Sequence, residues 1–194
     1  MLSTPLTPHF TLKEVVDDPE WWDTLSGADQ LRYRTRLTAT CALAEFFRAQ
    51  LGPLSVGSGI RSPRVQNSIR GASPTSEHPL GYCLDLTPAL HAELPLDQRR
   101  SLLAKAIARF INLDVVFDQI IWYPGGGDGQ QSNFPFMHLS LRSDQDQTRN
   151  RRMLLASTGV GKYAPWASAQ TVFPCLSPVA SGLQPGSSLF PLSR

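Results

Sequence analysis

Apolar residues recur every three or four positions in two long stretches of the chain, which is the spacing of one helix face. The first stretch begins at Ser26 and Asp29, a pair typical of a helix start, and ends at Gly52-Pro53, which stops a helix. Its apolar positions are Leu37, Cys41, Ala44, Phe47 and Leu51. The second stretch, from about residue 97 to 111, carries Leu103, Ile107 and Phe110 at the same spacing. Both stretches are predicted to be helices with a buried face.

Three shorter helices are predicted from the signals at their ends. Thr11 followed by Glu14 forms a capping-box pattern at the start of the first. Ser62-Pro63 opens the second, with proline at the tolerated first position, and Gly71 ends it. The third is expected over residues 148 to 157, before the stop at Gly159.

Four segments are predicted to be β-strands from their alternation and their β-branched and aromatic residues. They are residues 54–58 (LSVGS), 82–88 (YCLDLTP), 115–123 (VVFDQIIWY) and, as the final strand, 134–141 (FPFMHLSL). Alternation places Cys83 and Asp85 on one face of the second strand. The opposite face carries Tyr82, Leu84 and Leu86. On the final strand, one face carries Phe136, His138 and Ser140.

Helices and strands interleave without regular βαβ units, so the sequence predicts an α+β domain with a small, mainly antiparallel sheet flanked by helices. This domain is expected to span residues 1–163. Residues 164–194 contain five prolines, six serines and a single charged residue, Arg194. A segment of that composition is a poor core-former, and we predict a largely irregular or disordered tail.

The composition argues against several classes of protein, including nucleic-acid-binding and membrane-spanning proteins. Of 194 residues, 41% are hydrophobic and 18% are charged, and the net charge of +2 is too small to indicate a nucleic-acid or anionic-membrane partner. No stretch approaches the roughly 18 apolar residues needed to span a bilayer. The three cysteines have no paired spacing, and the N-terminus lacks the pattern of a signal peptide. We therefore expect a protein made in the cytoplasm, without a membrane span.

The candidate chemistry lies in SEHPLGYCLDL, residues 76–86, where His78 and Asp85 are seven positions apart. His138, one of four histidines, lies on the last predicted strand. Two imidazole nitrogens and one carboxylate oxygen suit Zn²⁺, and three protein ligands leave a fourth position open for water. Zinc lowers the pKa of such a water towards about 7. Spacing alone also leaves open a surface histidine and a strand-end aspartate that caps backbone amides.

The longer segment SGIRSPRVQNSIRGASPTSEHPLGYCLDL resembles the signature of the zinc D-Ala-D-Ala carboxypeptidase family, in the branch shared by phage endolysins and small single-stranded DNA phages. The family pattern is S-G-x-R-S-P at a strand end, an asparagine, a G-[GA]-x-x-x-S-x-H loop, and then G-x-A-x-D. The matching residues here are Ser58, Gly59, Arg61, Ser62, Pro63, Asn67, Gly71, Ala72, Ser76, His78, Gly81 and Asp85. FDQIIWYP and FMHLSL resemble the two later strands, and RNRRMLL followed by GKY resembles the closing helix. The likeness covers roughly residues 9–163.

The resemblance implies a hedgehog/DD-peptidase-like fold and a zinc peptidase that hydrolyses an amide bond in peptidoglycan stem peptides, as a D-Ala-type carboxypeptidase or an endopeptidase. It implies one Zn²⁺ bound by His78, Asp85 and His138. Arg61 would bind the carboxylate or carbonyl of the peptide and stabilise the tetrahedral intermediate, and Ser76 would touch substrate or orient its loop. The resemblance also implies a phage-associated role on the host cell wall, reached after release or delivery.

The general base is the point where the chain departs from the family. Many relatives carry a glutamate three residues before the last histidine or just after the Q-[IL]-I strand, and here those positions are Pro135 and Tyr123. Tyr123 could donate a hydrogen bond to the oxyanion, but a pKa near 10 makes a tyrosine a poor base. The remaining candidates nearby are Asp118, Asp128 and Glu77, of which Asp118 also fits a strand-to-loop hydrogen-bonding role.

Three alternatives stay open. Cys83 shares a strand face with Asp85, so it is either a thiolate ligand or a small packing residue where relatives usually have alanine. The missing glutamate leaves open a catalytically silent zinc-binding module of a cell wall or virion. The arginines Arg149, Arg151 and Arg152 form either a solvated helix face or a nucleic-acid contact, against which the near-neutral charge argues. The sequence does not indicate an oligomeric state.

Overall fold

One mixed sheet organises the chain in the computed structural model, which describes residues 2–89, 92–113, 115–125, 134–144, 150–159 and 162–166. Its six strands have the order β1-β2-β4-β3-β5-β6. They are β1 (Leu54–Ser58), β2 (Cys83–Pro88), β3 (Gln119–Tyr123), β4 (Phe136–Ser140), β5 (Met153–Gly159) and β6 (Lys162–Pro165). Every neighbouring pair is antiparallel except β3 and β5. The predicted α+β fold with a mainly antiparallel sheet is confirmed.

Several helices begin at the signals that their sequence carries, whereas α4 ends at Ser68, before the predicted stop at Gly71. They are α1 (Leu12–Val15), α2 (Pro19–Thr24), α3 (Gly27–Leu51), α4 (Pro63–Ser68) and α5 (Leu96–Ile111), with a 3₁₀ turn η1 (His78–Leu80). At the start of α3, the Ser26 hydroxyl accepts the Asp29 N–H. At its end, Gly52 adopts a φ of 76°, which favours glycine. α4 starts at Ser62, whose hydroxyl accepts the Val65 N–H.

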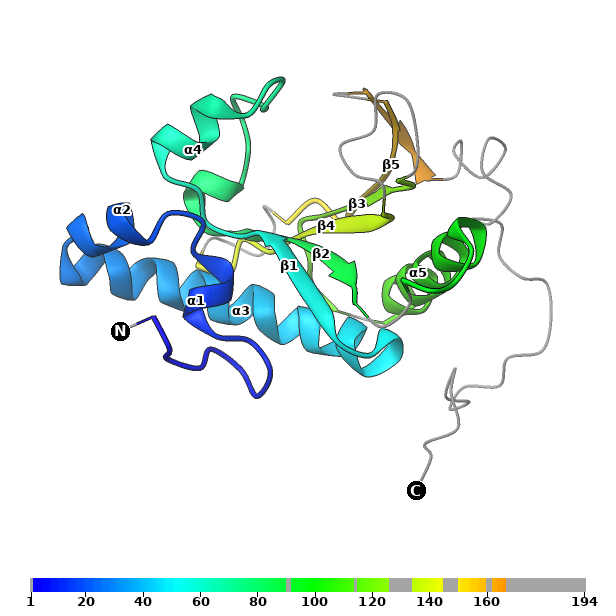
Figure 1. Cartoon of the computed structure of the whole chain (residues 1–194), viewed down its shortest axis with the longest axis horizontal. Helices are drawn as coiled ribbons and strands as arrows, with labels where there is room; N and C mark the ends of the chain where they lie inside the picture. Colours follow the sequence, from blue (N-terminus) through cyan, green and yellow to red (C-terminus); the bar gives the residue numbers. More distant parts are fainter. Residues whose placement is uncertain are drawn as a thin grey trace.

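The main core lies between the sheet and the two long helices, α3 and α5, which cover the same face (Figure 1). The predicted apolar face of α3 is confirmed, since its members are fully buried: Leu37, Cys41, Ala44, Phe47 and Leu51. The sheet contributes Leu84, Leu86, Ile120, Trp122, Met137 and Leu139. Burial of each large apolar side chain stabilises the fold by about 1.5–3 kcal/mol.

The opposite face of the sheet carries the polar candidates, as alternation predicted. β2 directs Asp85 and Cys83 to this face, and β4 directs His138 there. Tyr123 and Phe136 form a second, smaller apolar cluster with Ile121 beside them. The fold therefore keeps its main core and its reactive side chains on opposite sides of one sheet.

The last predicted helix is wrong, because Met153–Gly159 is strand β5. Methionine, leucine and alanine favour helices locally, but β5 pairs in parallel with β3 and buries Ala156 completely. Arg152 just before it has a φ of 49°, which does not occur inside a helix. FPFMHLSL is consequently not the final strand, and Arg149 lies outside the described residues.

The folded domain extends beyond residue 163. β6 runs to Pro165, and Trp166 is 6% exposed with its ring 6.3 Å from that of Trp122. The first three residues of the predicted 164–194 tail thus belong to the domain, and residues 167–194 lie outside the described part of the chain. Within that described part, no helix combines the length and apolarity needed to cross a bilayer.

Two buried acids and two partly exposed arginines form an ion network that ties the loop before β2 to the start of β3 and the end of β4. Arg142 donates to Glu77 Oε1 at 2.5 Å and 3.1 Å, and it lies 3.6 Å from Asp118 Oδ2. Arg151 donates to both oxygens of Asp118, at 3.0 Å and 2.6 Å. Asp118 is fully buried and Glu77 is 4% exposed, so their charges depend on these guanidinium partners. Arg151 is exposed, as predicted, but it belongs to this network and does not lie on a helix.

Asp118→Asn is expected to lower the free energy of unfolding at neutral pH by about 3 kcal/mol, because it breaks a buried charge pair. The matched control is Asp97→Asn, which removes an exposed acid paired with Arg100 and should change stability by less than about 0.5 kcal/mol. Denaturant unfolding monitored by circular dichroism measures both variants.

The difference in unfolding free energy between the wild type and Asp118→Asn is expected to depend on pH. Burial would raise the pKa of Asp118, but the hydrogen bonds and charge of Arg151 outweigh it, so the pKa lies below the ordinary value of 3.8. The contribution of Asp118 is therefore present above that value and is lost as the pH falls through the lowered pKa. The stability gap between the wild type and Asp118→Asn should narrow on acidification. A gap that widens would contradict this assignment.

Candidate metal centre

Two neighbouring strands and one turn bring the predicted ligands together. In the antiparallel pair of β2 and β4, Asp85 lies directly opposite His138, so the two side chains are cross-strand neighbours. His78 comes from η1, which ends at Gly81 with a left-handed φ of 72°. A side chain at Gly81 would be strained there and would approach Tyr33. Glycine at this position lets the chain turn from His78 straight into the strand that carries Asp85.

The Asp85 carboxylate lies between the two imidazoles. Its Oδ2 is 3.2 Å from Nε2 of His78, and its Oδ1 is 2.9 Å from Nδ1 of His138. Around a tetrahedral ion with bonds of 2.0–2.2 Å, ligand atoms are separated by about 3.3 Å. The observed separations are somewhat shorter and involve two different oxygens of Asp85. The Asp85 carboxylate therefore contacts both predicted histidine ligands.

The orientation of His78 is fixed by its other ring nitrogen. Nδ1 lies 2.7 Å from the carbonyl oxygen of Gly59. A carbonyl can only accept, so Nδ1 carries the hydrogen and Nε2 is the atom that faces Asp85. Two acceptors at 3.2 Å repel each other unless a proton or a metal cation lies between them. Such a backbone bond to the second nitrogen is the usual support of a metal-binding histidine.

Burial and charge act on this group in opposite directions. Burial alone would raise the pKa of Asp85, but the charges and hydrogen bonds of His78 and His138 hold it far below its usual range. Burial lowers the pKa of His138, and the nearby Asp85 only partly opposes that shift. At neutral pH the site therefore presents an ionised carboxylate and, at His138, a neutral imidazole, which are the forms that bind metals.

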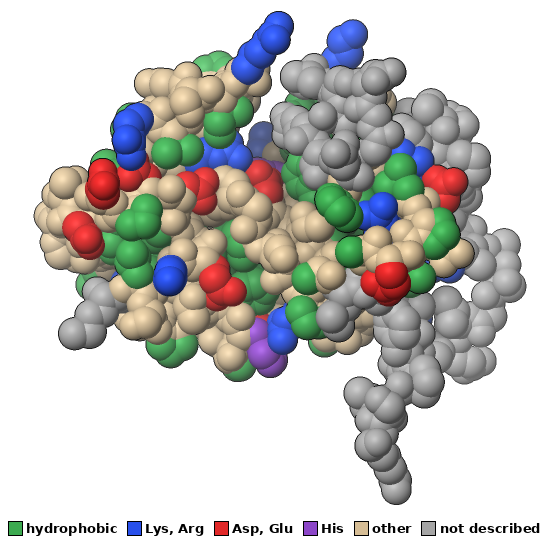
Figure 2. Space-filling model, viewed as in Figure 1, with side chains coloured by type: hydrophobic (Ala, Val, Ile, Leu, Met, Phe, Trp, Pro, Cys, Tyr) green, Lys and Arg blue, Asp and Glu red, His purple; other side chains and the backbone are tan. Residues whose placement is uncertain are grey.

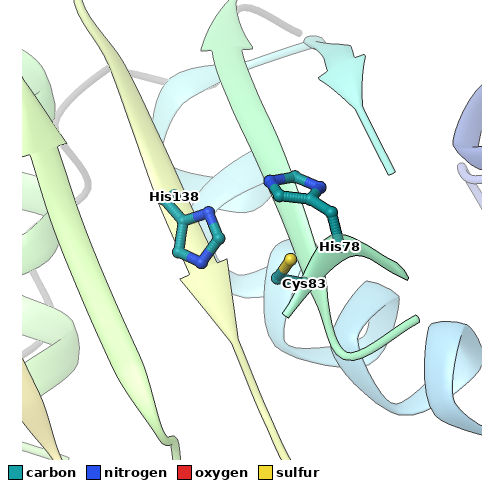
Figure 3. Close-up of side chains that lie close together, drawn as sticks. All are labelled: His78, Cys83 and His138. Atoms are coloured by element: carbon teal, nitrogen blue, oxygen red, sulfur yellow. The ribbon is translucent and has the colours of Figure 1, made fainter. Parts of the chain in front are cut away.

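Cys83 joins the same group of donors. Ligand atoms of His78, Cys83 and His138 all lie within 4.8 Å of one another, and the three side chains point toward a common region (Figure 3). Cys83 is fully buried, and this burial raises the pKa of its thiol well above the ordinary value. The group can hold a metal ion. Both interpretations of Cys83, as a packing residue and as a thiolate ligand, therefore stay open.

Arg61 lies against the same carboxylate. Its NH2 group donates to Asp85 Oδ2 at 3.0 Å, and its Nε donates to the Ser58 hydroxyl at 2.8 Å. Its longest hydrogen bond runs from NH1 to Gln66, at 3.4 Å. In the space-filling view, basic, acidic and histidine side chains gather at a hollow on this face of the molecule (Figure 2). The predicted cationic clamp thus lies beside the predicted metal ligands.

Ser76 and Tyr123 occupy less direct positions. The Ser76 hydroxyl accepts the His78 N–H at 3.4 Å, a long bond that fits the loop-orienting role. Tyr123 stacks on Phe136 with centroids 4.2 Å apart, and its hydroxyl lies 3.3 Å from that of Tyr163. Burial raises the pKa of Tyr123 far above its usual value, so it is not a base at neutral pH.

Two of the predicted general bases, Asp118 and Glu77, contact arginines of the ion network. Asp118 lies just before Gln119, which pairs with Ser140 rather than with His138, and Arg151 occupies both of its oxygens. Its placement supports a structural role and not proton transfer at the metal centre. Glu77 directs Oε1 to Arg142 in the same ion network. Asp128 lies outside the described residues.

One acidic residue at this site was missed in the sequence. Asp17 accepts hydrogen bonds from the Ser58 hydroxyl and the Gly59 N–H, next to Arg61. These contacts join residues 41 and 42 positions apart, so no local spacing in FTLKEVVDDPEW indicates them. Neither the scan against family models nor the search of curated proteins gives a match for this chain.

The purified protein is expected to retain one zinc ion per chain, and each of the variants His78→Ala, Asp85→Ala and His138→Ala to lose most of it. The reason is that each removes a donor from a group already near bonding geometry. His9→Ala is the matched control, because that histidine is 51% exposed and pairs with Glu45 elsewhere. Elemental analysis after dialysis measures the metal. Equal zinc in His138→Ala and the wild type would contradict the site.

Proposed function

We propose that this protein is a zinc-dependent peptidase that hydrolyses an amide bond in peptidoglycan stem peptides, with His78, Asp85 and His138 as the metal ligands. The observation that carries the proposal is the convergence of these side chains from η1, β2 and β4 onto contacts of 2.9 Å and 3.2 Å. The family resemblance over residues 58–85 supports the reaction class, as does the cation of Arg61 beside the ligands.

The donor set agrees with zinc. Two imidazoles and a carboxylate are ligands of catalytic zinc sites, and bound zinc supplies a Lewis acid and an activated water at neutral pH. The chain itself supplies orientation. Gly59 fixes the imidazole of His78, and Asp85 bridges the two histidines. The deeply buried rings keep the donors in place, so little reorganisation is needed when an ion binds.

Arg61 is the residue that we assign to the substrate. A guanidinium binds a carboxylate through two parallel hydrogen bonds, and it stabilises charge that develops on a carbonyl oxygen. A free C-terminal carboxylate, as on a stem peptide ending in D-alanine, is the anion that this group would select. An apolar cluster of Ile121, Tyr123 and Phe136 lies on the adjoining strands, where Ile121 pairs with His138. Action on the host cell wall in a phage context rests on the resemblance.

Incubation with purified muropeptides is expected to give zinc-dependent release of a peptide or D-alanine. His138→Ala should abolish this release, and Arg61→Lys should lower kcat/KM by about 100-fold while zinc is retained, because lysine cannot form the paired contact. Liquid chromatography with mass spectrometry identifies the products.

The outcome of that assay separates two functions. His9→Ala should release as much product as the wild type, and it controls for the substitution of a histidine. Zinc-loaded protein that binds muropeptides but releases nothing would overturn the peptidase proposal and leave a binding module.

A second candidate function, a catalytically silent zinc module, is favoured by one specific observation. Cys83 contributes a donor to the same buried group as both histidines. Together with Asp85, it would complete four protein ligands, and structural zinc sites are closed in this way. Asp118 is bound through both oxygens by Arg151, which leaves it less available as a base and agrees with this alternative.

Cobalt substitution distinguishes the two candidates. A thiolate bound to Co²⁺ gives a charge-transfer band in the near ultraviolet, whereas nitrogen and oxygen ligands do not. The peptidase proposal expects no such band and unchanged turnover in Cys83→Ala. A band that disappears in Cys83→Ala but persists in Cys41→Ala, a buried cysteine of α3, would favour the closed site.

A further inference from the structure

The segment from Val15 to Asp17 runs beside the turn that follows β1. Val16 and Ile60 form a parallel bridge. The Ile60 N–H donates to the Val15 carbonyl at 2.7 Å, and the Asp17 N–H donates to the Ile60 carbonyl at 3.1 Å. A Cβ on Gly59 would lie 2.1 Å from the Val15 oxygen, so only glycine allows this approach. The N-terminal segment therefore holds the turn at residues 59–60 through both the N–H and the carbonyl of Ile60.

The Asp17 side chain adds two contacts to that turn. Its Oδ1 accepts the Gly59 N–H at 2.8 Å, and its Oδ2 accepts the Ser58 hydroxyl at 2.5 Å. Hydrogen bonds to a charged acceptor are shorter and stronger than neutral ones. The carboxylate is 18% exposed, so most of its solvation comes from these donors and from Arg61, whose Nε lies 3.7 Å away.

Each of these two contacts of Asp17 supports a residue that in turn contacts a side chain of the metal centre. Gly59, held at its N–H by Asp17, presents the carbonyl that accepts Nδ1–H of His78. Ser58 has a single hydroxyl hydrogen, and because this hydrogen points to Asp17, the oxygen lone pairs face Nε of Arg61. One carboxylate thereby sets the direction of the first histidine and of the guanidinium.

We propose that Asp17 is a positioning residue of the metal centre, acting on His78 through Gly59 and on Arg61 through Ser58. The proposal rests on the metal site described under the proposed function. Asp17 touches neither the predicted metal ligands nor a substrate, and its effect is on the orientation of groups that do. Loss of such outer partners lowers metal affinity by about 10- to 100-fold in other metal sites.

The test compares zinc affinities by competition with a chromophoric chelator, which needs no substrate. Asp17→Asn is expected to bind zinc about 10- to 100-fold more weakly than the wild type. Ser58→Ala, which removes only the arm to Arg61, should bind zinc within about threefold of the wild type. Asp23→Asn, an exposed acid of α2, is the matched control and should not differ. Near-ultraviolet circular dichroism verifies that each variant is folded.

Folded Asp17→Asn with wild-type zinc affinity would overturn the proposal. If Asp17→Asn does not fold, Asp17→Glu replaces it in the test, because it keeps the charge but shifts both contacts. This variant is also expected to bind zinc more weakly than the wild type. Equal zinc affinity in Asp17→Glu and the wild type would again reject the positioning role of Asp17. Failure of the wild-type protein to bind zinc would instead refute the metal centre itself. The two failures are therefore distinct.

Discussion

The buried charge of Asp85 is the constraint on which the rest of this site depends. An ionised carboxylate that is mostly removed from water must be paired and hydrogen-bonded, or it would take up a proton instead. Asp85 has three cationic or polar partners within 3.2 Å: two imidazoles and the guanidinium of Arg61. Those partners come from η1, β4 and the turn after β1. Three separate parts of the chain thus contact one carboxylate on β2, and other contacts must hold each of these parts in place.

The supports follow from ordinary rules of packing and pairing. Strand alternation sends Leu84 and Leu86 into the core and leaves Asp85 on the other face, so the residues that anchor β2 also aim the carboxylate. The cross-strand register then places His138 opposite it. Backbone contacts hold the remaining partners, since the Gly59 carbonyl orients His78 and the Ser58 hydroxyl orients Arg61. The site is therefore held by two interior strands of the sheet, β2 and β4, and by the turn after β1.

Features with a local period could be predicted from the sequence, and features made by distant partners could not. The buried face of α3 and the faces of β2 and β4 were predicted because 3.6-residue and 2-residue periods are visible in any short window. β5 was mistaken for a helix because its strand state depends on pairing with β3, more than thirty residues earlier. For the same reason the contact of the exposed Arg151 with Asp118, 33 positions earlier, was not predicted. Of the site, the ligands were predicted from spacing and resemblance, whereas Asp17 has no local signal at all.

The pairing of Arg61 with Asp85 links ligand chemistry to substrate chemistry. In the chain alone, the guanidinium is held on one side by Ser58 and Asp17 and on the other by Asp85. Once Asp85 shares its charge with a divalent cation, its attraction for Arg61 falls, while the contacts to Ser58 and Asp17 are unchanged. Arg61 would then remain in place with one of its two edges less occupied, which is the edge that a peptide carboxylate or an oxyanion needs. On the proposed function, the two acids around this arginine would have different tasks: Asp17 would keep the guanidinium in position, and Asp85 would make its availability depend on the metal.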